Sequence, residues 1–354
     1  MTLPAYRIAL AGDSAPAAPF AQRPRRYSVG APQPAHPASL HTLAGTSMGT
    51  QWSVRLGNPH MRPLDGARRL VEHTLDAVVR QMSHWEPDSD LSRFGRAPAG
   101  SWQRLPEQCF AVLQAALDWA RQSQGALDPT VGPLVALWGF GPHAQASARR
   151  CPPDDAAIAT LRPGQHWRHL ALRPQTHEAW QPGGVTLDFS GIAKGFAVDW
   201  VLQTLVEAGW TDCLVEIGGE LRASGQRPDG HPWRVAIAGE DGTAASGNLA
   251  PALALRNMAM ATSGDHWQAW EHAGLRLGHT IDPRSGRPVA HPLSSVTVLH
   301  RECMHADALA TVLTVLGPDA GLAFAEAREV AALFAVRTPQ GLLARPSTAF
   351  RALA

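Results

Sequence analysis

The stretch from residue 185 to residue 199 constrains the fold more than any other part of the chain. Val185 and Leu187 predict a short apolar strand, and Ser190-Gly191 predicts a turn. A helix is predicted after the turn, because apolar residues recur every four positions at Ile192, Phe196 and Trp200. A strand, a turn and a helix start leave backbone N–H groups unpaired, and such a turn suits an anion such as a phosphate. The alternative is an ordinary helix N-terminus with one solvated lysine.

The lysine in this stretch is unusual for the composition of the chain. Lys194 is the only lysine among 31 basic residues, and every other basic residue is arginine. Lysine presents a compact ammonium, whereas arginine presents a planar fork of donors. A lysine that survives such a bias indicates a position that needs a point charge.

The order of predicted elements indicates an α+β fold with mixed, largely antiparallel sheets and packed helices. Alternating apolar residues predict strands and four-residue periodicity predicts helices, but the two types do not alternate regularly along the chain, as they would in a doubly wound fold. Helices are predicted at 64–82, from Pro106 to just before Gly125, and at 154–161, 305–316 and 320–327. Strands are predicted at 52–56, 213–217, 233–237, 294–299 and 330–336.

The segment from residue 125 to residue 142 is rich in Gly and Pro and yet apolar. Such composition predicts an irregular loop that either covers a site or forms a buried connection, and the residues alone leave both open.

The ends of the chain and its composition bound the class of protein. Residues 1–40 are rich in Ala and Pro and predict a disordered leader, and 41–350 predict a single domain. We expect no transmembrane segment, and the missing signal peptide favours the cytoplasm, although a misassigned start would look the same. A net charge of +1 gives no electrostatic case for nucleic acid. Four widely separated cysteines suggest neither a disulfide framework nor a zinc site.

One pair of oxygen-bearing side chains could hold a cation. Asp307 and Thr311 lie at positions i and i+4 of a predicted helix, so both side chains project from one face. Mg²⁺ accepts a few protein oxygens and completes its shell with water and phosphate. The alternative is an Asp near a helix N-terminus and a Thr bonded back to a carbonyl. His279, before an Asp-Pro turn, is unremarkable alone, and neither a GxGxxG nor a Walker A motif is present.

Taken in order, the motifs of this chain resemble those of the ApbE family, the FAD:protein FMN transferases. The resemblance covers about residues 43 to 340. The matching segments are 47–50, 82–89, 127–134, 137–141, 187–199, 217–219, 261–265, 279–286 and 306–311. So many matches in the expected order outweigh the alternatives given for each motif alone.

The resemblance implies an ApbE-like fold, FAD as substrate and Mg²⁺ as cofactor. It places FAD against Met48, Trp85, Ala126, Leu127, Asp128, Asp188, Lys194 and Ile281, with Trp85 stacking on the flavin. It assigns Mg²⁺ to Asp307, Thr311 and the backbone carbonyl of Gly191, and it makes His279 the base that acts on the acceptor hydroxyl.

The resemblance also implies the reaction and its partners. The FMN part of FAD passes to a Ser or Thr hydroxyl of an acceptor protein with an Asp-Gly-x-Ser/Thr-Gly-type motif, expected to be a respiratory or redox protein, and AMP is released. Ala310 stands where some relatives carry an acidic residue, so a two-metal site is in doubt. An FAD pyrophosphatase and a non-catalytic flavin-binding protein stay open as alternatives. Many relatives are exported lipoproteins, so a misassigned start would leave a periplasmic, membrane-associated location open.

Overall fold

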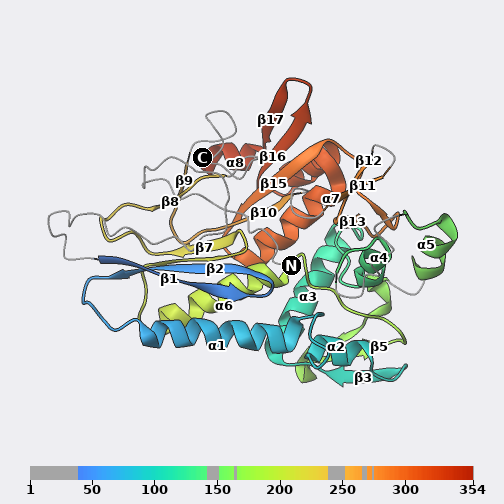
Figure 1. Ribbon diagram of the computed structural model, residues 1–354, viewed down its shortest axis with the longest axis horizontal. Helices are drawn as coiled ribbons and strands as arrows, with labels where there is room; N and C mark the ends of the chain where they lie inside the picture. Colours follow the sequence, from blue (N-terminus) through green and yellow to red (C-terminus); the bar gives the residue numbers. More distant parts are fainter. Residues whose placement is uncertain are drawn as a thin grey trace.

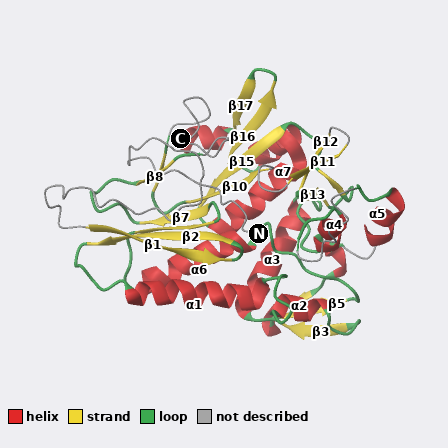
Figure 2. Cartoon of the chain, viewed as in Figure 1, coloured by secondary structure: helices red, strands yellow, loops and turns green. Residues whose placement is uncertain are grey.

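A long antiparallel sheet organises the chain, with its three longest covering helices on one face (Figures 1 and 2). The computed structural model describes residues 39–141, 151–162, 166–237, 252–264, 269–272 and 275–353. The predicted leader lies almost wholly outside the described residues, so that prediction is untested.

The main sheet has eight strands, and every neighbouring pair is antiparallel. In spatial order they are β1 (Ser39–Ser47), β2 (Thr50–Asn58), β6 (Cys213–Ile217), β7 (Glu220–Ser224), β10 (Ala259–Gly264), β15 (Leu293–His300), β16 (Ala331–Thr338) and β17 (Gly341–Pro346). This sheet and its helices confirm the predicted α+β class with largely antiparallel strands.

Side chains alternate between two cores, one on each face of the sheet. On β10, Ala259 and Ala261 face the helices, whereas Met260 belongs to the core on the other face. The helical face is covered by α1 (Asp65–Met82), α6 (Ala193–Glu207) and α7 (Cys303–Ala327). The other face is covered by β8 (Trp233–Val235), β9 (Leu253–Leu255) and α8 (Thr348–Leu353), whose apolar residues share one cluster with the sheet. Burial on both faces explains the apolar runs of the central strands.

Smaller elements extend the fold on the side of α3 (Figure 1). They are α2 (Asp90–Gly95), β3 (Ser101–Arg104), α3 (Glu107–Gln122), α4 (Gly132–Leu137), α5 (Asp155–Leu161), β4 (Leu172–Arg173), β5 (Glu178–Gln181), β11 (Ala269–His272), β12 (Leu275–Gly278), β13 (Ile281–Asp282) and β14 (Arg287–Pro288). The helix α4 falls in the segment that we predicted as irregular, and Pro133 lies in its first turn, where a proline is tolerated.

The predicted strand at Val185 and Leu187 is wrong. Both side chains are buried, but the backbone there joins no sheet. The buried amide of Gln181 supplies the missing partners: its Nε2 donates to the Val185 carbonyl at 2.9 Å, and its Oε1 accepts from the Val185 N–H at 3.2 Å. One side chain therefore satisfies both backbone groups of Val185, so this residue needs no neighbouring strand.

The helix α7 is built as a core element. It is long and apolar enough to cross a membrane by length and composition, but more than half of that apolar stretch is buried inside the protein. Gly317 leaves the helical region with φ of 79° just before Pro318, so the helix is kinked where we predicted one helix to stop and another to begin.

Candidate functional site

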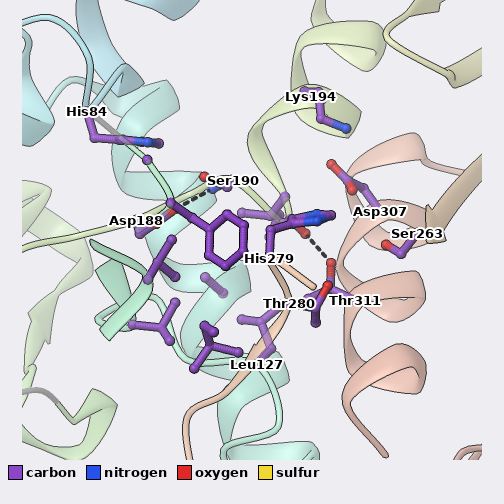
Figure 3. A pocket seen from close by; sticks show the side chains of 18 of the residues that line it. His84, Leu127, Asp188, Ser190, Lys194, Ser263, His279, Thr280, Asp307 and Thr311 are labelled. Carbon is purple, nitrogen blue, oxygen red and sulfur yellow. Dashed lines mark hydrogen bonds between the residues drawn. The ribbon is translucent and has the colours of Figure 1, made fainter. Parts of the chain in front are cut away.

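A cavity of about 340 Å³ opens where α6 and α7 begin, between the end of the main sheet and the α3 side of the molecule (Figure 3). Every site residue named from the sequence lines it: Met48, Trp85, Ala126, Leu127, Asp128, Asp188, Gly191, Lys194, His279, Ile281, Asp307 and Thr311. Residues from distant parts of the sequence thus meet at one place. Their individual roles stay predictions.

The β1–β2 hairpin places a methionine at the rim. Its two-residue turn, Met48-Gly49, has positive φ at both positions, 53° and 71°, which is the geometry whose twist suits a tight hairpin. A left-handed methionine is uncommon and is tolerated where the surroundings fix it, often at functional sites.

Trp85 presents an aromatic surface to solvent at the cavity. Its side chain is 61% exposed, although large aromatics usually lie inside. Its ring lies 6.0 Å from that of His84, which also lines the cavity. An exposed indole at the rim is available to stack on a flat ligand.

The carboxylate of Asp128 holds its own loop together. Oδ1 accepts from the N–H and the hydroxyl of Thr130 at 2.9 and 2.8 Å, and Oδ2 accepts from the Trp167 N–H at 3.2 Å. Burial raises the pKa of Asp128, although these donors favour its charged form. The N–H of Asp188 donates to the Pro129 carbonyl at 2.7 Å, which ties the two segments together. The Asp188 carboxylate accepts from the Ser190 N–H at 2.8 Å and so shapes the turn before α6.

Three charged groups converge at the start of α6. The Lys194 ammonium lies 2.5 Å from Glu220 Oε1, and the side chains of these residues are 32% and 3% exposed. Burial opposes the charge on Lys194, but Glu220 and Asp307 outweigh it, so the pKa of Lys194 is raised. Burial also raises the pKa of Glu220 to about 7, with Asp307 acting in the same direction and Lys194 against it.

The N-termini of α6 and α7 are interlocked. Asp307 of α7 accepts from the Gly195 N–H of α6 at 2.9 Å. In return, Asp199 of α6 accepts from the N–H groups of Cys303 and Met304 at 2.9 and 2.8 Å, and it pairs with Arg222 of β7 at 2.7 Å. The residue preceding α7 makes no side-chain cap, so Asp199 supplies the cap from the neighbouring helix.

Gly191 and Thr311 bring two further oxygens to the same place. The Thr311 hydroxyl lies 3.5 Å from the Gly191 carbonyl, the contact drawn in Figure 3. A Cβ at Gly191 would lie 2.7 Å from Thr311 Oγ1, so only glycine leaves this space open. A carboxylate, a hydroxyl and a carbonyl form the all-oxygen set that Mg²⁺ accepts, and the residues therefore fit the predicted ion.

His279 lies beside these groups in the cavity (Figure 3). Its ring meets that of Phe140 edge-on, with centroids 6.3 Å apart. Two residues further on, Ile281 is buried in a small apolar cluster with Phe140 and Trp138. The histidine is thus carried on a segment anchored by packing.

Sequence reasoning missed Glu220 as a site residue. It follows directly after the Gly218-Gly219 turn, lines the cavity and forms the ion pair with the single lysine. A carboxylate next to a Gly-Gly turn at a strand end was the signal that could have found it.

An α+β fold in which the N-terminus of a helix, a lysine, three oxygens that could hold a cation and a histidine share one cavity is typical of an enzyme that handles a phosphate-bearing ligand. A sequence model of the ApbE family matches residues 48–334, and the chain belongs to that family. The FAD:protein FMN transferase of Vibrio cholerae serotype O1 is 36% identical over 316 residues, covering 89% of this chain and 93% of that protein.

Two further relatives agree. The FAD:protein FMN transferase of Haemophilus influenzae is 36% identical over 321 residues, covering 88% of this chain and 91% of that protein. The structure of Pseudomonas stutzeri flavinyl transferase ApbE in its apo form superposes with a TM-score of 0.81 at 35% identity, covering 89% of this chain and 97% of that one.

Proposed function

We propose that this protein transfers the FMN moiety of FAD to a Ser or Thr hydroxyl of an acceptor protein and releases AMP. The observation that carries the proposal is the single cavity that unites Lys194, His279, Asp307 and Thr311 with the exposed ring of Trp85. The names of the relatives support the same reaction.

The bonds of the proposed step balance without any further reactant. The acceptor oxygen attacks the phosphorus on the FMN side of the FAD pyrophosphate, and the bond from that phosphorus to the bridging oxygen breaks. His279 takes the hydroxyl proton, AMP leaves with the bridging oxygen, and FMN ends in a phosphoester to the protein.

Other residues of the cavity would bind the flavin, the phosphates and the cation. Trp85 and Met48 at the rim would hold the flavin end, and the Lys194 ammonium would face the phosphates as a point charge. Asp307, Thr311 and the Gly191 carbonyl would hold Mg²⁺, which supplies neutralisation of the charge that develops on the phosphates. The helix α6 begins at Ala193, so the positive end of its dipole would add to this charge.

The acceptor is proposed by class. We propose a respiratory or redox protein that presents its Ser or Thr in an Asp-Gly-x-Ser/Thr-Gly-type motif on an accessible segment, because the hydroxyl must reach the cavity.

Intact mass spectrometry of such an acceptor tests the proposal. The acceptor is incubated with this protein, FAD and Mg²⁺, and AMP is followed in parallel. We expect a covalent FMN adduct that EDTA prevents. AMP and free FMN without an adduct on any motif-bearing acceptor would point instead to FAD hydrolysis, and FAD binding without AMP would point to a non-catalytic flavin-binding protein.

A further inference from the structure

Glu220 differs from the other carboxylates around the cavity. It is the first residue of β7, its side chain is 3% exposed, and its Oε1 is held by Lys194 at 2.5 Å. Its Oε2 is buried and has no hydrogen-bond partner in the parts of the chain that the structure describes. An ionised carboxylate oxygen is acceptor-only, and leaving it buried and unpaired is unfavourable.

The neighbouring carboxylates show what a satisfied group looks like here. Asp199 receives two backbone N–H groups and an arginine, and Asp128 receives donors on both oxygens. Glu216, four residues before Glu220, accepts from the Gly219 N–H on Oε1 and from the Ser53 hydroxyl on Oε2, each at 3.0 Å. Glu220 also lines the cavity, whereas Glu216 does not line it.

The charges around Glu220 determine which chemical groups can form a hydrogen bond with its Oε2. Lys194 brings one positive charge, and it lies close to the two carboxylates of Glu220 and Asp307. The Lys194 ammonium at Oε1 favours the ionised form of Glu220, and a phosphate oxygen placed on Oε2 of that form would be repelled, so the partner of the ionised group must be a hydrogen-bond donor. The ligands of the proposed function would supply two such O–H donors: a sugar-type hydroxyl of FAD or a water bound to the cation.

We propose that Glu220 is a ligand-binding residue whose Oε2 accepts a hydrogen bond from an O–H donor of the bound FAD and Mg²⁺, while its Oε1 keeps Lys194 in place. This inference rests on the proposed function, since it takes FAD and Mg²⁺ as the ligands. It adds Glu220 to the residues proposed to contact the ligand.

The substitution Glu220→Gln tests this with little change in shape. The amide keeps one oxygen for Lys194 and replaces the other by an N–H donor, so it reverses the hydrogen bond that the ligand would make. FAD affinity is measured in EDTA by flavin fluorescence, and Mn²⁺ affinity without FAD is measured by electron paramagnetic resonance. The matched control is Glu216→Gln, in which the amide oxygen can accept from the Gly219 N–H and the amide N–H can donate to the Ser53 hydroxyl oxygen.

If a hydroxyl of FAD is the donor, we expect FAD affinity in EDTA to fall about tenfold in Glu220→Gln. Loss of a negative charge beside Lys194 would by itself strengthen the binding of an anionic ligand, so a fall has the opposite sign from the charge effect. If a cation-bound water is the donor, Mn²⁺ affinity falls instead and FAD affinity in EDTA does not.

A second variant separates hydrogen bonding from charge in the Mn²⁺ arm. Glu220→Asp keeps the charge but draws the carboxylate back by one methylene, so the hydrogen bond is lost and Mn²⁺ affinity should still fall. Weaker Mn²⁺ binding in Glu220→Gln alone would be a charge effect and would overturn the inference. Wild-type affinities in both variants would also overturn it while leaving the proposed function intact. Failure of the wild-type protein to bind FAD would instead remove the proposed function.

Discussion

Lys194 lies where the first turn of α6 meets two buried carboxylates. Its ammonium reaches Glu220 at 2.5 Å from a side chain that is itself two-thirds covered. A guanidinium is planar and larger, and its donors point in fixed directions, so it cannot occupy the same place between Glu220 and the cavity. This explains why lysine persists at one position in a chain that uses arginine everywhere else.

We therefore expect Lys194→Arg to weaken FAD binding by at least tenfold although the charge is kept. Flavin fluorescence in the presence of Mg²⁺ measures the change. The control is Arg121→Lys on the exposed side of α3, which should bind FAD as the wild type does. Equal affinity in Lys194→Arg would mean that a positive charge alone is needed there.

His279 is predicted to move a proton and not to hold FAD. Replacing it with Ala should lower the rate of FMN transfer by a factor of about 10² to 10⁴, the range typical of a general base. FAD affinity should stay within about twofold, because Lys194 and the residues proposed to hold the flavin and the cation are unchanged. Single-turnover transfer is followed by intact mass, with the exposed His231 replaced by Ala as the control. Unchanged transfer in His279→Ala would disprove the role.

At the scale of elements, the cavity depends on the crossing of α6 and α7. Asp199 caps α7 from α6 and Asp307 returns the contact, so neither helix can shift along the other without breaking hydrogen bonds near the predicted cation ligands. We expect Asp199→Ala to lower the free energy of unfolding by about 2 kcal/mol, since the cap of α7 and the partner of Arg222 are lost together.

The same variant should weaken Mn²⁺ binding even though Asp199 is not a predicted ligand. Denaturant unfolding and Mn²⁺ titration measure the two effects. Asp199→Asn, which keeps one acceptor oxygen, should restore part of both. A stability loss with unchanged Mn²⁺ affinity would show that the cap does not position Asp307.

The closeness of the two helices also depends on Gly195. A Cβ at this position would lie 2.3 Å from the Cys303 carbonyl oxygen and 2.8 Å from Asp307 Cβ. We expect Gly195→Ala to lower the free energy of unfolding by about 2 kcal/mol, because the helices must move apart. Gly66→Ala in α1 has nothing within 4 Å of the new Cβ and should leave stability unchanged or slightly higher. Thermal unfolding of the pair tests the packing argument.

The elements that sequence patterns predicted well are those whose own residues decide their structure. The strand β6 matches its predicted range because apolar residues there face cores on both sides of the sheet. The strand predicted at Val185 failed because the side-chain amide of Gln181, four residues earlier, satisfies the backbone of Val185 in place of a neighbouring strand, and a pattern of apolar residues does not reveal such a partner. The break in α7 at Gly317 was predicted correctly, because glycine and proline act on the backbone at their own positions.

Part of the site could be predicted from the sequence, but not from local patterns of residues. Motifs that line one cavity are separated by tens to hundreds of positions in the sequence, and periodicity alone could not bring His279 to Asp307. The order of the motifs along the chain, compared with that of a known family, predicted that these residues share one site. Glu220 was missed because its role follows from the ion pair with Lys194. That pair joins β7 to α6, and only the folded structure brings these two elements together.

Across the whole protein, bound FAD and Mg²⁺ should contact several separate parts of the fold at once. The cavity is lined from the β1–β2 hairpin, the turn before α6, α7 and the segment at Ile281, which belong to different apolar clusters. A ligand that contacts all of them binds the folded chain and not the unfolded one, so it stabilises the fold by about 2.7 kcal/mol at one hundred times its dissociation constant.

We predict that FAD and Mg²⁺ together raise the melting temperature by more than the sum of their separate effects. Phosphate oxygens of FAD would complete the shell of a cation held by Asp307 and Thr311, so each ligand should improve the site of the other. Thermal scans of His279→Ala, in which FAD is not consumed, measure the four combinations, with EDTA as the metal-free arm. The variant Thr311→Val keeps the side-chain shape but removes the hydroxyl, and it should abolish the excess while the effect of FAD alone survives. Strictly additive shifts in His279→Ala would mean that the two ligands bind without contact, and the shared site inferred from Gly191, Asp307 and Thr311 would be wrong.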